Sequence, residues 1–398
     1  MVDTVTEDSL EVRAMDEFKS LGYNLIDAYT PNREDLKDST GRTNKDQLVL
    51  SQVLIQSLKE INPHIPGEII HDEAKAIIED ASLNSKLLKD KNYERYQDIL
   101  NGIKVKFRRE GKETIEYLNL IDYENPKNNT FTVARQVWID GEYGYRRPDI
   151  LVYINGLPLV WIELKKPSEN VQLGYTYNLI NQKHDIPQLF FFNQLCIISN
   201  GHQTKAGSYN SSFSHYFEWL KVDDEKEKID RKMIDNNEIS LQYLIKGLMP
   251  KEKIIDYIEN FILYLNKDTK IVAKSHQFIG VNNAIDSFKN RDGKNGKLGV
   301  FWHTQGSGKS FSMVMYVRKI RRKYSGNYTF LMITDRDDLN TQLLKNFVRT
   351  GVIQDSDAVK AKSGSHLREM LQSNTSMIFT LIHKFRSDYD TKFPLLST

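Results

Sequence analysis

The sequence contains a single cysteine, Cys196, among 398 residues. An internal disulfide is therefore excluded, and one thiol suits a reducing compartment. No apolar run approaches the ~18–20 residues that a membrane-spanning helix needs. The acidic residues 1–8 lack the basic and apolar regions of a signal peptide. We therefore expect a protein of the cytoplasm that has no membrane partner.

The sequence also has little excess charge of either sign. It holds 55 Lys and Arg against 53 Asp and Glu, a net charge of +2. Any DNA-binding surface must therefore be a local concentration of positive charge, because the whole chain provides almost none. A composition of 39% hydrophobic and 27% charged residues is typical of a globular protein, and the length predicts two or three domains.

The rest of the chain is organised around residues 145–166, YRRPDILVYINGLPLVWIELKK. Two largely apolar runs, 150–154 and 159–164, are separated by Asn155-Gly156, and this dipeptide is the strongest short-range indication of a β-hairpin. Because the runs are nearly continuous in apolar residues, at least one strand should be buried on both faces.

Three charged residues, Asp149, Glu163 and Lys165, lie at the ends of these runs, where burial of an unpaired charge is costly. Glu163 and Lys165 are two apart on a strand and so share a face. A bare two-residue loop would place Asp149 opposite Ile162, facing away from Glu163. A three-residue loop or one bulge would place Asp149 opposite Glu163, since a one-residue slip turns every side chain over. A functional site requires the second register, and the alternative is a hairpin end whose charges are incidental.

The chemistry expected of these three residues is metal-assisted hydrolysis. Asp149 and Glu163 are hard oxygen ligands suited to Mg²⁺, which polarises a phosphodiester oxygen and helps to produce hydroxide. Lys165 would hold or activate the attacking water. Lys166 faces the other way, and we interpret it as a phosphate contact or as plain surface.

The flanking sequence predicts an α/β domain that occupies residues 1–220. Glu11 lies close to the apolar stripe of the first helix, and we favour a solvated glutamate over a site residue. Residues 221–269 are interpreted as a charged surface segment and connecting helices. The expected helices are 7–21, 45–61, 67–88 and 173–183, and the expected strands are 102–108, 114–122, 130–139 and 195–199.

A second domain is expected at residues 270–398. Strands alternate there with helices, and this order predicts a parallel, doubly wound sheet. The expected strands are 297–302, 328–334 and 376–380, and the expected helices are 277–288, 309–323 and 339–347.

A phosphate-binding loop is predicted between the first of these strands and the helix that follows. Gly306 and Gly308 would let backbone N–H groups approach the phosphates, and the helix N-terminus adds a favourable dipole. Lys309 would reach the β- and γ-phosphates of ATP, and Ser310 would join the Mg²⁺ shell. His303 stands where the usual motif has its first glycine. The predicted loop residues are Thr304, Gly306, Ser307, Gly308, Lys309 and Ser310.

An ATP motor also needs an acidic strand end that orients Mg²⁺ and water. No Asp-Glu pair follows the strand expected at 376–380, and the chain stops at Thr398. We therefore expect an incomplete motor lobe that binds nucleotide rather than hydrolysing it.

Taken together, these motifs resemble the amino-terminal part of the R (restriction) subunit of type I restriction–modification enzymes. The resemblance covers most of the chain, most clearly residues 40–65, 131–205 and 274–385. The stretches that match are Arg147-Pro-Asp-Ile, Asn155-Gly-Leu-Pro-Leu-Val, Ile162-Glu-Leu-Lys-Lys-Pro, Ser275-His-Gln-Phe, His303-Thr-Gln-Gly-Ser-Gly-Lys-Ser, Thr334-Asp-Arg-Asp-Asp-Leu and Ile378-Phe-Thr-Leu-Ile-His-Lys-Phe.

The resemblance implies a PD-(D/E)xK-type nuclease domain followed by a truncated RecA-like lobe of the superfamily 2 helicases. It implies ATP-dependent cleavage of double-stranded DNA coupled to translocation, with methyltransferase and specificity subunits as partners. Gln277 would read adenine. The family's Gln-x-x-x-Tyr helix corresponds here to Asn178 and Gln182, so a phosphate contact and a plain surface helix both stay open for that segment.

Two alternatives are weighed against this interpretation. A repair-type helicase–nuclease would resect DNA ends without methyltransferase partners, and copurification separates the two. A non-catalytic DNA-docking module would use the hairpin charges only structurally.

Overall fold

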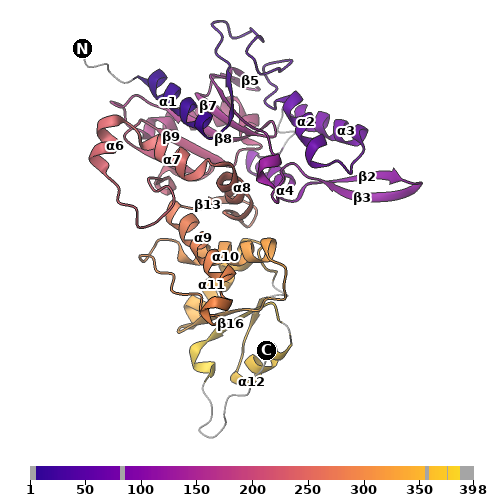
Figure 1. Ribbon diagram of the computed structural model, residues 1–398, viewed down its shortest axis with the longest axis vertical. Coiled ribbons are helices and arrows are strands. Elements are labelled where there is room, and N and C mark those ends of the chain that lie inside the picture. The colour runs from indigo at the N-terminus through magenta and orange to yellow at the C-terminus, as the bar shows by residue number, and fades with distance from the viewer. Residues whose placement is uncertain (1–5, 81–85, 355–357, 374, 386–398) are drawn as a thin grey trace. The chain divides into compact units, whose positions relative to one another are not determined.

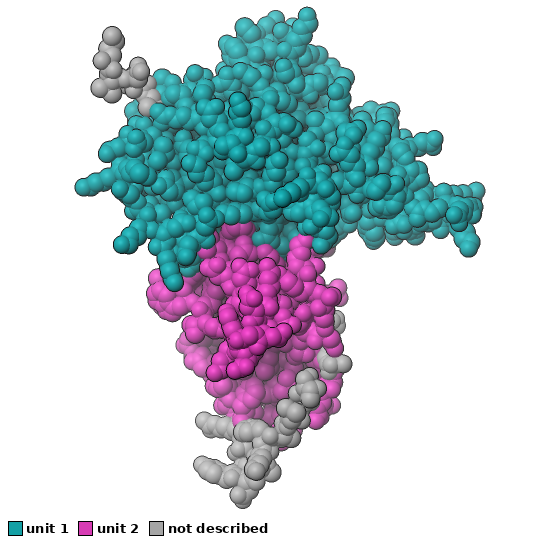
Figure 2. Space-filling view, viewed as in Figure 1, with its two compact units in different colours: residues 1–262, 268–275 teal, residues 263–267, 276–398 magenta. Residues whose placement is uncertain are grey.

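The computed structural model describes residues 6–80, 86–354, 358–373 and 375–385. The chain divides into two compact units, which Figure 2 distinguishes by colour. Unit 1 comprises residues 1–262 and 268–275, and unit 2 comprises residues 263–267 and 276–398. The mixture of helices and strands confirms the expected α/β class.

Unit 1 is built on a seven-stranded mixed sheet (Figure 1). The pairs β1–β4 and β8–β9 are parallel, and the remaining neighbours are antiparallel. Every residue of the central strands β7, β8 and β9 is buried, which confirms the inference from their continuous apolar runs. The strands in spatial order are β1 (Asn24–Asp27), β4 (Phe131–Arg135), β7 (Ile150–Ile154), β8 (Leu157–Leu164), β9 (Leu195–Ser199), β10 (Thr204–Gly207) and β11 (Phe217–Glu218).

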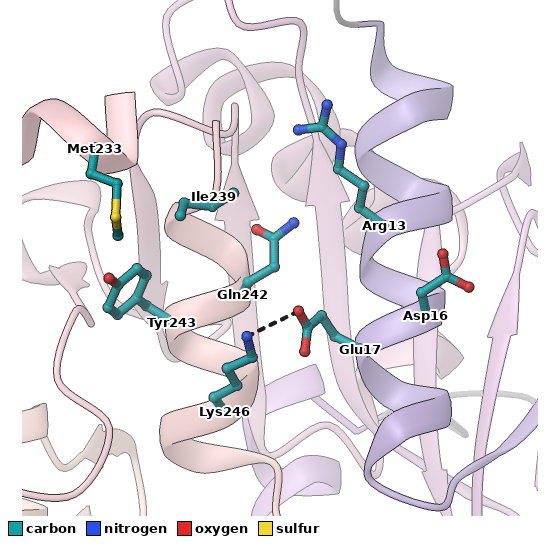
Figure 3. A pocket seen from close by; sticks show the side chains of 8 residues that line it. All are labelled: Arg13, Asp16, Glu17, Met233, Ile239, Gln242, Tyr243 and Lys246. Atoms are coloured by element: carbon teal, nitrogen blue, oxygen red, sulfur yellow. Dashed lines mark ion pairs between the residues drawn. The ribbon is translucent and has the colours of Figure 1, made fainter. Parts of the chain in front are cut away.

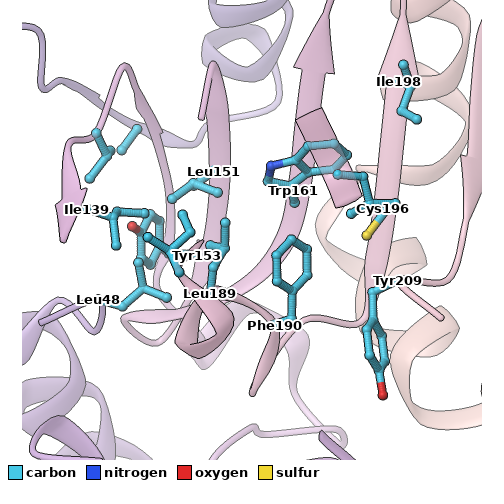
Figure 4. Packing of buried hydrophobic residues seen from close by; sticks show 14 of the residues in the cluster. Leu48, Ile139, Leu151, Tyr153, Trp161, Leu189, Phe190, Cys196, Ile198 and Tyr209 are labelled. Atoms are coloured by element: carbon cyan, nitrogen blue, oxygen red, sulfur yellow. The ribbon is translucent and has the colours of Figure 1, made fainter. Parts of the chain in front are cut away.

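One face of this sheet packs into an aromatic core (Figure 4). Trp161 of β8 is fully buried and lies with its ring centroid 6.3 Å from that of Phe190. Leu151 and Cys196 from the neighbouring strands belong to the same cluster. Full burial of one large apolar side chain contributes about 1.5–3 kcal/mol, so this core holds the central strands in a fixed register.

Helix α1 (Glu7–Ser20) matches the helix expected at 7–21 and begins at a capping box between Thr6 and Ser9. Helix α2 (Ser51–Ile61) begins six positions later than expected, because residues 41–50 form bends and irregular backbone. There Arg42 and Lys45 both pair with the buried carboxylate of Asp38 at 2.8 Å.

The helix expected at 67–88 is wrong in its extent, because α3 (Gly67–Ile78) ends earlier and residues 81–85 lie outside the described chain. Helix α4 (Leu88–Asn101) was not predicted. Its inward face includes Lys91 and Asn92, so the sequence shows no clean apolar stripe. The helix expected at 173–183 is a π-helical turn, Gly174–Leu179, followed by α5 (Ile180–Asp185).

The segment expected to connect the domains forms three helices that belong to unit 1: α6 (Arg231–Asn237), α7 (Ser240–Leu248) and α8 (Lys251–Asn260). Helices α7 and α1 lie side by side around a pocket of about 550 Å³ (Figure 3). Lys246 and Glu17 bridge the two helices at 3.1 Å. The charged stretch before α6 therefore leads into packed structure.

Two small antiparallel ribbons complete the strands before the central hairpin. The first pairs β2 (Ile103–Arg109) with β3 (Lys112–Leu118) and confirms the strands expected at 102–108 and 114–122. The second pairs β5 (Ile139–Gly141) with β6 (Gly144–Arg146). No helix of the described residues is both long and apolar enough to cross a membrane.

Unit 2 contains a sheet in the order β14 (Phe330–Thr334), β16 (Met377–Leu381), β15 (Ala358–Lys360), with both pairs parallel. This confirms the parallel sheet expected for the second domain. Its helices are α9 (Ser275–Lys289), α10 (Lys309–Lys323), α11 (Asp337–Arg349) and α12 (Gly364–Gln372). Strands β12 (Ile262–Leu265) and β13 (Thr269–Val272) precede α9.

The strand expected at 297–302 is wrong, because these residues are irregular. Val300 is 94% exposed and Trp302 is 76% exposed. A strand needs a neighbour for its backbone hydrogen bonds and a surface for its apolar side chains. In the described part of the three-stranded sheet, no strand pairs with residues 297–302.

Candidate functional site

The central hairpin adopts the register that a functional site requires. Asn155 and Gly156 form a two-residue turn with φ of 51° and 80°, as a type I′ turn demands. Ile154 pairs with Leu157, but Ile150 pairs with Ile162, because a bulge shifts the register between Val152 and Tyr153. One more step along β7 places Asp149 opposite Glu163.

Local hydrogen bonds agree with this register. The backbone N–H of Leu164 donates to Asp149 Oδ2 at 2.7 Å. Lys165 Nζ lies 3.3 Å from Glu163 Oε1 and 3.8 Å from Glu7 Oε1. The structure thus brings Asp149, Glu163 and Lys165 together, as the sequence predicted. Lys166, the next residue, is exposed.

Glu163 is 3% exposed and is held by amides of the helical segment that covers it. Gln182 Nε2 donates to Glu163 Oε2 at 3.1 Å, and Asn178 Nδ2 donates to Glu163 Oε1. Trp161 Nε1 donates in turn to Gln182 Oε1 at 2.8 Å. Asn178 and Gln182 therefore bind the candidate catalytic carboxylate, a role that neither sequence reading of this segment included.

Glu11 is a second addition, because its carboxylate is buried beside the hairpin. Gln136 Nε2 donates to Glu11 Oε2 at 2.9 Å and lies 3.4 Å from Asp149 Oδ1, so one amide joins the two acids. The solvated reading of Glu11 is wrong, since the residue is 4% exposed. Its position on α1 next to the apolar stripe was the only indication in the sequence.

The carboxylates have raised pKa values. Burial, followed by the charge of Asp149, raises the pKa of Glu11 to about 7. Burial raises the pKa of Asp149 to about 6 and outweighs the N–H of Leu164 and the charge of Lys165, which lower it. Burial and then Asp149 hold the pKa of Glu163 well above its usual range. The site concentrates negative charge, which Lys165, Arg135 and Arg147 partly offset.

For Lys165, unlike the carboxylates, the neighbouring charges outweigh burial in setting the pKa. Burial lowers the pKa of its ammonium, but Glu163 and Asp149 outweigh burial and raise the pKa above its usual value. The side chain is therefore a cation at neutral pH.

A divalent cation fits this donor set. Glu11 Oε1 is buried and has no hydrogen-bond partner among the described residues. Asp149 raises the pKa of both other carboxyls through like charge, and a bound cation would reverse this repulsion. In the described chain no three His, Cys, Asp or Glu side chains stand close enough to form a ready-made ligand cluster. Asp149 and Glu163 therefore form the core of the candidate site, with Glu11 beside it.

An open cleft of about 380 Å³ leads to Asp149 and Glu11. Arg147 lines it, with its guanidinium 4.8 Å from the ring centroid of Trp138 and 5.4 Å from that of Tyr29. Arg135 also lines the cleft and pairs with Asp27. Glu7 and Asp8 line the cleft as well, so its four carboxylates outnumber its two arginines, and a bound cation would reduce the repulsion of an entering phosphate.

The predicted phosphate loop leads directly into α10 in unit 2. Gly308 caps this helix with φ of 88°, and Gly306 has φ of 80°, so both occupy the left-handed region that glycine favours. Lys309 Nζ donates to the carbonyls of His303 and Thr304 at 2.8 and 2.9 Å. Thr304 and Ser307 lie in the loop, and Ser310 lies in the first turn of α10.

Gln277 lies at the start of α9 and contacts this loop. Its Nε2 donates to the carbonyl of Gly308 at 3.0 Å, and a Cβ on Gly308 would lie only 2.8 Å from it. His276 Nε2 lies 2.9 Å from the carbonyl of Ser307. The structure thus brings Gln277 to the loop, and its reading of adenine stays a prediction.

The family model described as "Type I restriction enzyme R protein N terminus" matches residues 4–215. This is more than half of the chain. The chain belongs to the type I restriction enzyme R-protein family. A second model, "SWI2/SNF2 ATPase", matches residues 276–398, the part of this R-family chain that contains the phosphate loop.

Relatives agree with this assignment. The chain is 32% identical, over 99% of its length, to the type I restriction enzyme HindI endonuclease subunit of Haemophilus influenzae. It is 32% identical over 98% of its length to the putative type I restriction enzyme MjaIXP endonuclease subunit of Methanocaldococcus jannaschii. A Staphylococcus aureus type I subunit, SauCOLORF180P, is 26% identical over 79% of the chain. The chain spans 38% of each of the first two relatives.

Proposed function

We propose that unit 1 is the nuclease domain of a type I restriction endonuclease and has a PD-(D/E)xK-type active site. The observation that supports this most directly is the bulged register of the hairpin, which sets Asp149 opposite Glu163 and leaves Lys165 on the same face. A hairpin with incidental charges would have no need of this bulge or of the two amides that hold Glu163.

Asp149 and Glu163 would hold Mg²⁺, with Glu11 close enough to bind it through water. The bound ion would polarise a phosphodiester oxygen of DNA and lower the pKa of the attacking water. Asn178 and Gln182 orient Glu163 by donating to both of its oxygens. Such donors keep a ligand carboxylate in one orientation and tune its affinity.

Lys165 acts as a fixed cation rather than as a base. Because Glu163 and Asp149 raise its pKa, its ammonium keeps its proton at neutral pH. It would therefore orient the attacking water through a donated hydrogen bond and stabilise the charge that develops on the phosphate.

Unit 2 is proposed to be the first RecA-like lobe of a superfamily 2 motor that binds ATP with Mg²⁺. Lys309 would exchange the carbonyls of His303 and Thr304 for the β- and γ-phosphates. Ser310 would contribute a hydroxyl to the metal shell, and Gln277 would face the base.

For the full-length protein we propose ATP-driven translocation of double-stranded DNA followed by cleavage. Sequence recognition and methylation would belong to separate specificity and methyltransferase subunits of the complex. Location in the cytoplasm stays a prediction.

The nuclease proposal is tested by Lys165→Ala in the full-length subunit assembled with its partners. We expect cleavage of plasmid DNA to be lost while the ATPase rate stays at the wild-type level. Lys166→Ala is the matched control, because it removes the neighbouring charge from the opposite face of the strand and should leave cleavage intact. Cleavage at the wild-type rate by the Lys165 variant would contradict the assignment.

A further inference from the structure

The β2–β3 ribbon projects from the rest of unit 1 as a two-stranded arm (Figures 1 and 2). We call residues 103–118 the basic arm. An isolated two-stranded hairpin is only marginally stable in water, so its inner face needs support. Val105 and Phe107 on that face are buried, and Arg109 donates to the carbonyl of His64 at 2.6 Å.

The outer face of the basic arm alternates with this anchored face along both strands. Its cations are Lys104, Lys106 and Arg108, at every second position of β2. Across the ribbon they pair with three exposed residues of β3, in the register Lys104 with Tyr117, Lys106 with Ile115 and Arg108 with Glu113. Tyr117 is 53% exposed and Ile115 is 50% exposed.

The outer face of the basic arm carries more positive than negative charge. The basic arm as a whole contains five lysines and arginines and three glutamates, a net charge of +2. This equals the net charge of the whole chain, so the remaining residues sum to zero, although they include other basic stretches such as residues 318–323. Lys106 lies 3.8 Å from Glu113, and both side chains are more than 60% exposed. Such a pair contributes at most about 1 kcal/mol and can exchange for a phosphate contact.

We propose that the outer face of the basic arm binds the sugar–phosphate backbone of duplex DNA. The proposal rests on the proposed function in that DNA is the substrate of unit 1, and it names a second contact away from the nuclease cleft. Strands of seven residues extend about 24 Å at ~3.4 Å per residue, and the major groove admits a two-stranded ribbon. Lysine and arginine at alternate positions reach phosphates, while Tyr117 packs against sugar and base edges.

The basic arm makes contacts that do not depend on base sequence. Its outer face has three cations, one carboxylate and two apolar groups, and none of the asparagine or glutamine side chains that read adenine. Binding should therefore weaken steeply with salt, since each neutralised phosphate releases counterions. A tethered nuclease with such an arm would bind duplex DNA of any sequence.

The test uses the 398-residue chain and a short fluorescent duplex, with fluorescence anisotropy measured without Mg²⁺ over a series of salt concentrations. In the variant Lys104→Ala, Lys106→Ala, Arg108→Ala we expect the Kd to rise at least about tenfold at low salt. The slope of log Kd against log salt should fall by about 1 to 3, or roughly 0.9 per lost contact. Two duplexes of unrelated sequence should respond alike.

Two control variants make the result specific. Lys59→Ala, Lys75→Ala, Lys127→Ala removes the same charge from exposed positions of other elements and should bind like the wild type. Lys104→Arg, Lys106→Arg, Arg108→Lys keeps the charge and should also retain binding. Equal melting temperatures would show that the alanine variant folds, as expected for side chains outside the core.

Wild-type affinity in the alanine variant overturns the proposal, as does a wild-type chain that binds no duplex. If Ile115→Ser with Tyr117→Ser releases a methyltransferase subunit while DNA binding is unchanged, the outer face docks protein and the proposal is again overturned. Cleavage at the wild-type rate by the Lys165→Ala variant would overturn the nuclease assignment. It would not affect the proposal that the basic arm binds DNA.

Discussion

Gln182 donates a hydrogen bond from Nε2 to Glu163 Oε2 at 3.1 Å. Its orientation is determined, because the indole N–H of Trp161 is only a donor and occupies Gln182 Oε1 at 2.8 Å. The amide must therefore present its NH₂ group to the glutamate. A core tryptophan thus fixes the orientation of a side chain that fixes the candidate metal ligand.

Gln182→Ala should weaken Mg²⁺ binding and slow DNA cleavage by about 10- to 100-fold, as for other residues that orient a metal ligand. The expected change is a higher half-saturating Mg²⁺ concentration, measured by titrating cleavage in the assembled enzyme. Gln172→Ala is the control, since Gln172 is exposed on the same segment. An unchanged Mg²⁺ requirement in the Gln182 variant would show that the amide is merely structural.

Metal binding should depend on pH near neutrality. Metal ligands must be deprotonated, and the pKa is about 6 for Asp149 and about 7 for Glu11. As pH falls from 8 to 6, protons compete with Mg²⁺, and the half-saturating Mg²⁺ concentration should rise several-fold. Glu11→Gln removes one titrating group and should flatten this dependence. The same curve in wild type and variant would exclude Glu11 from the site.

The same shifts determine how stability varies with pH. A carboxyl whose pKa is raised on folding stabilises the protein at low pH, and this contribution is lost as pH rises through its folded value. For Asp149 and Glu11 the loss falls between about pH 4 and 7. Without metal the chain should therefore be less stable at pH 8 than at pH 6, and Mg²⁺ should raise the Tm more at pH 8.

The hairpin turn should tolerate no side chain at Gly156. A Cβ there would lie 2.6 Å from the carbonyl oxygen of Leu50 and 2.8 Å from the N atom of Leu54, and φ is 80°. Gly156→Ala should cost about 2–4 kcal/mol, from the left-handed backbone and from displacement of the start of α2. Thermal unfolding measures the effect. Gly67→Ala, where nothing lies within 4 Å, should be close to neutral.

The phosphate loop should bind nucleotide through Lys309. Lys309→Ala removes a charged hydrogen-bond donor worth about 1.5–3 kcal/mol, so the Kd for ATP with Mg²⁺ should rise about 10- to 100-fold in calorimetric titration. Lys345→Ala changes an exposed cation of α11 and serves as the control. Equal affinities in the two variants would contradict the nucleotide-binding role of the loop.

The hairpin was predictable because its evidence is local. Asn155-Gly156 dictates a turn, and apolar runs dictate buried strands, so position and burial follow from a few neighbouring residues. The register was open between two alternatives, although Pro158 gave an indication. Proline inside a sheet occurs at edge strands, strand starts and bulges, and Pro158 pairs with Tyr153 beside the bulge.

The partners of Glu163 could not be predicted, because they come from a separate segment of the chain. Asn178 and Gln182 are unremarkable polar residues of a short helical segment, and only tertiary structure brings them to the glutamate. Glu11 gave a weak indication by its place beside an apolar stripe. The prediction of a strand at 297–302 was wrong because it rested on local composition alone. Apolar, β-rich residues do not form a strand without a neighbouring strand.

The bulge determines whether residues paired across the hairpin are separated by an odd or an even number of sequence positions. A two-residue turn without a bulge pairs residues an odd number of positions apart, as with Ile154 and Leu157, and one bulge makes the number even, as with Ile150 and Ile162. Asp149 and Glu163 are separated by an even number. Without the bulge, the same sequence would turn the two acids to opposite sides of the sheet, whereas deleting the extra residue of β8 would make the interval odd and keep them paired on one side. In relatives that keep the two-residue turn, an even interval between these acids therefore requires a bulge if the two acids are to share a face.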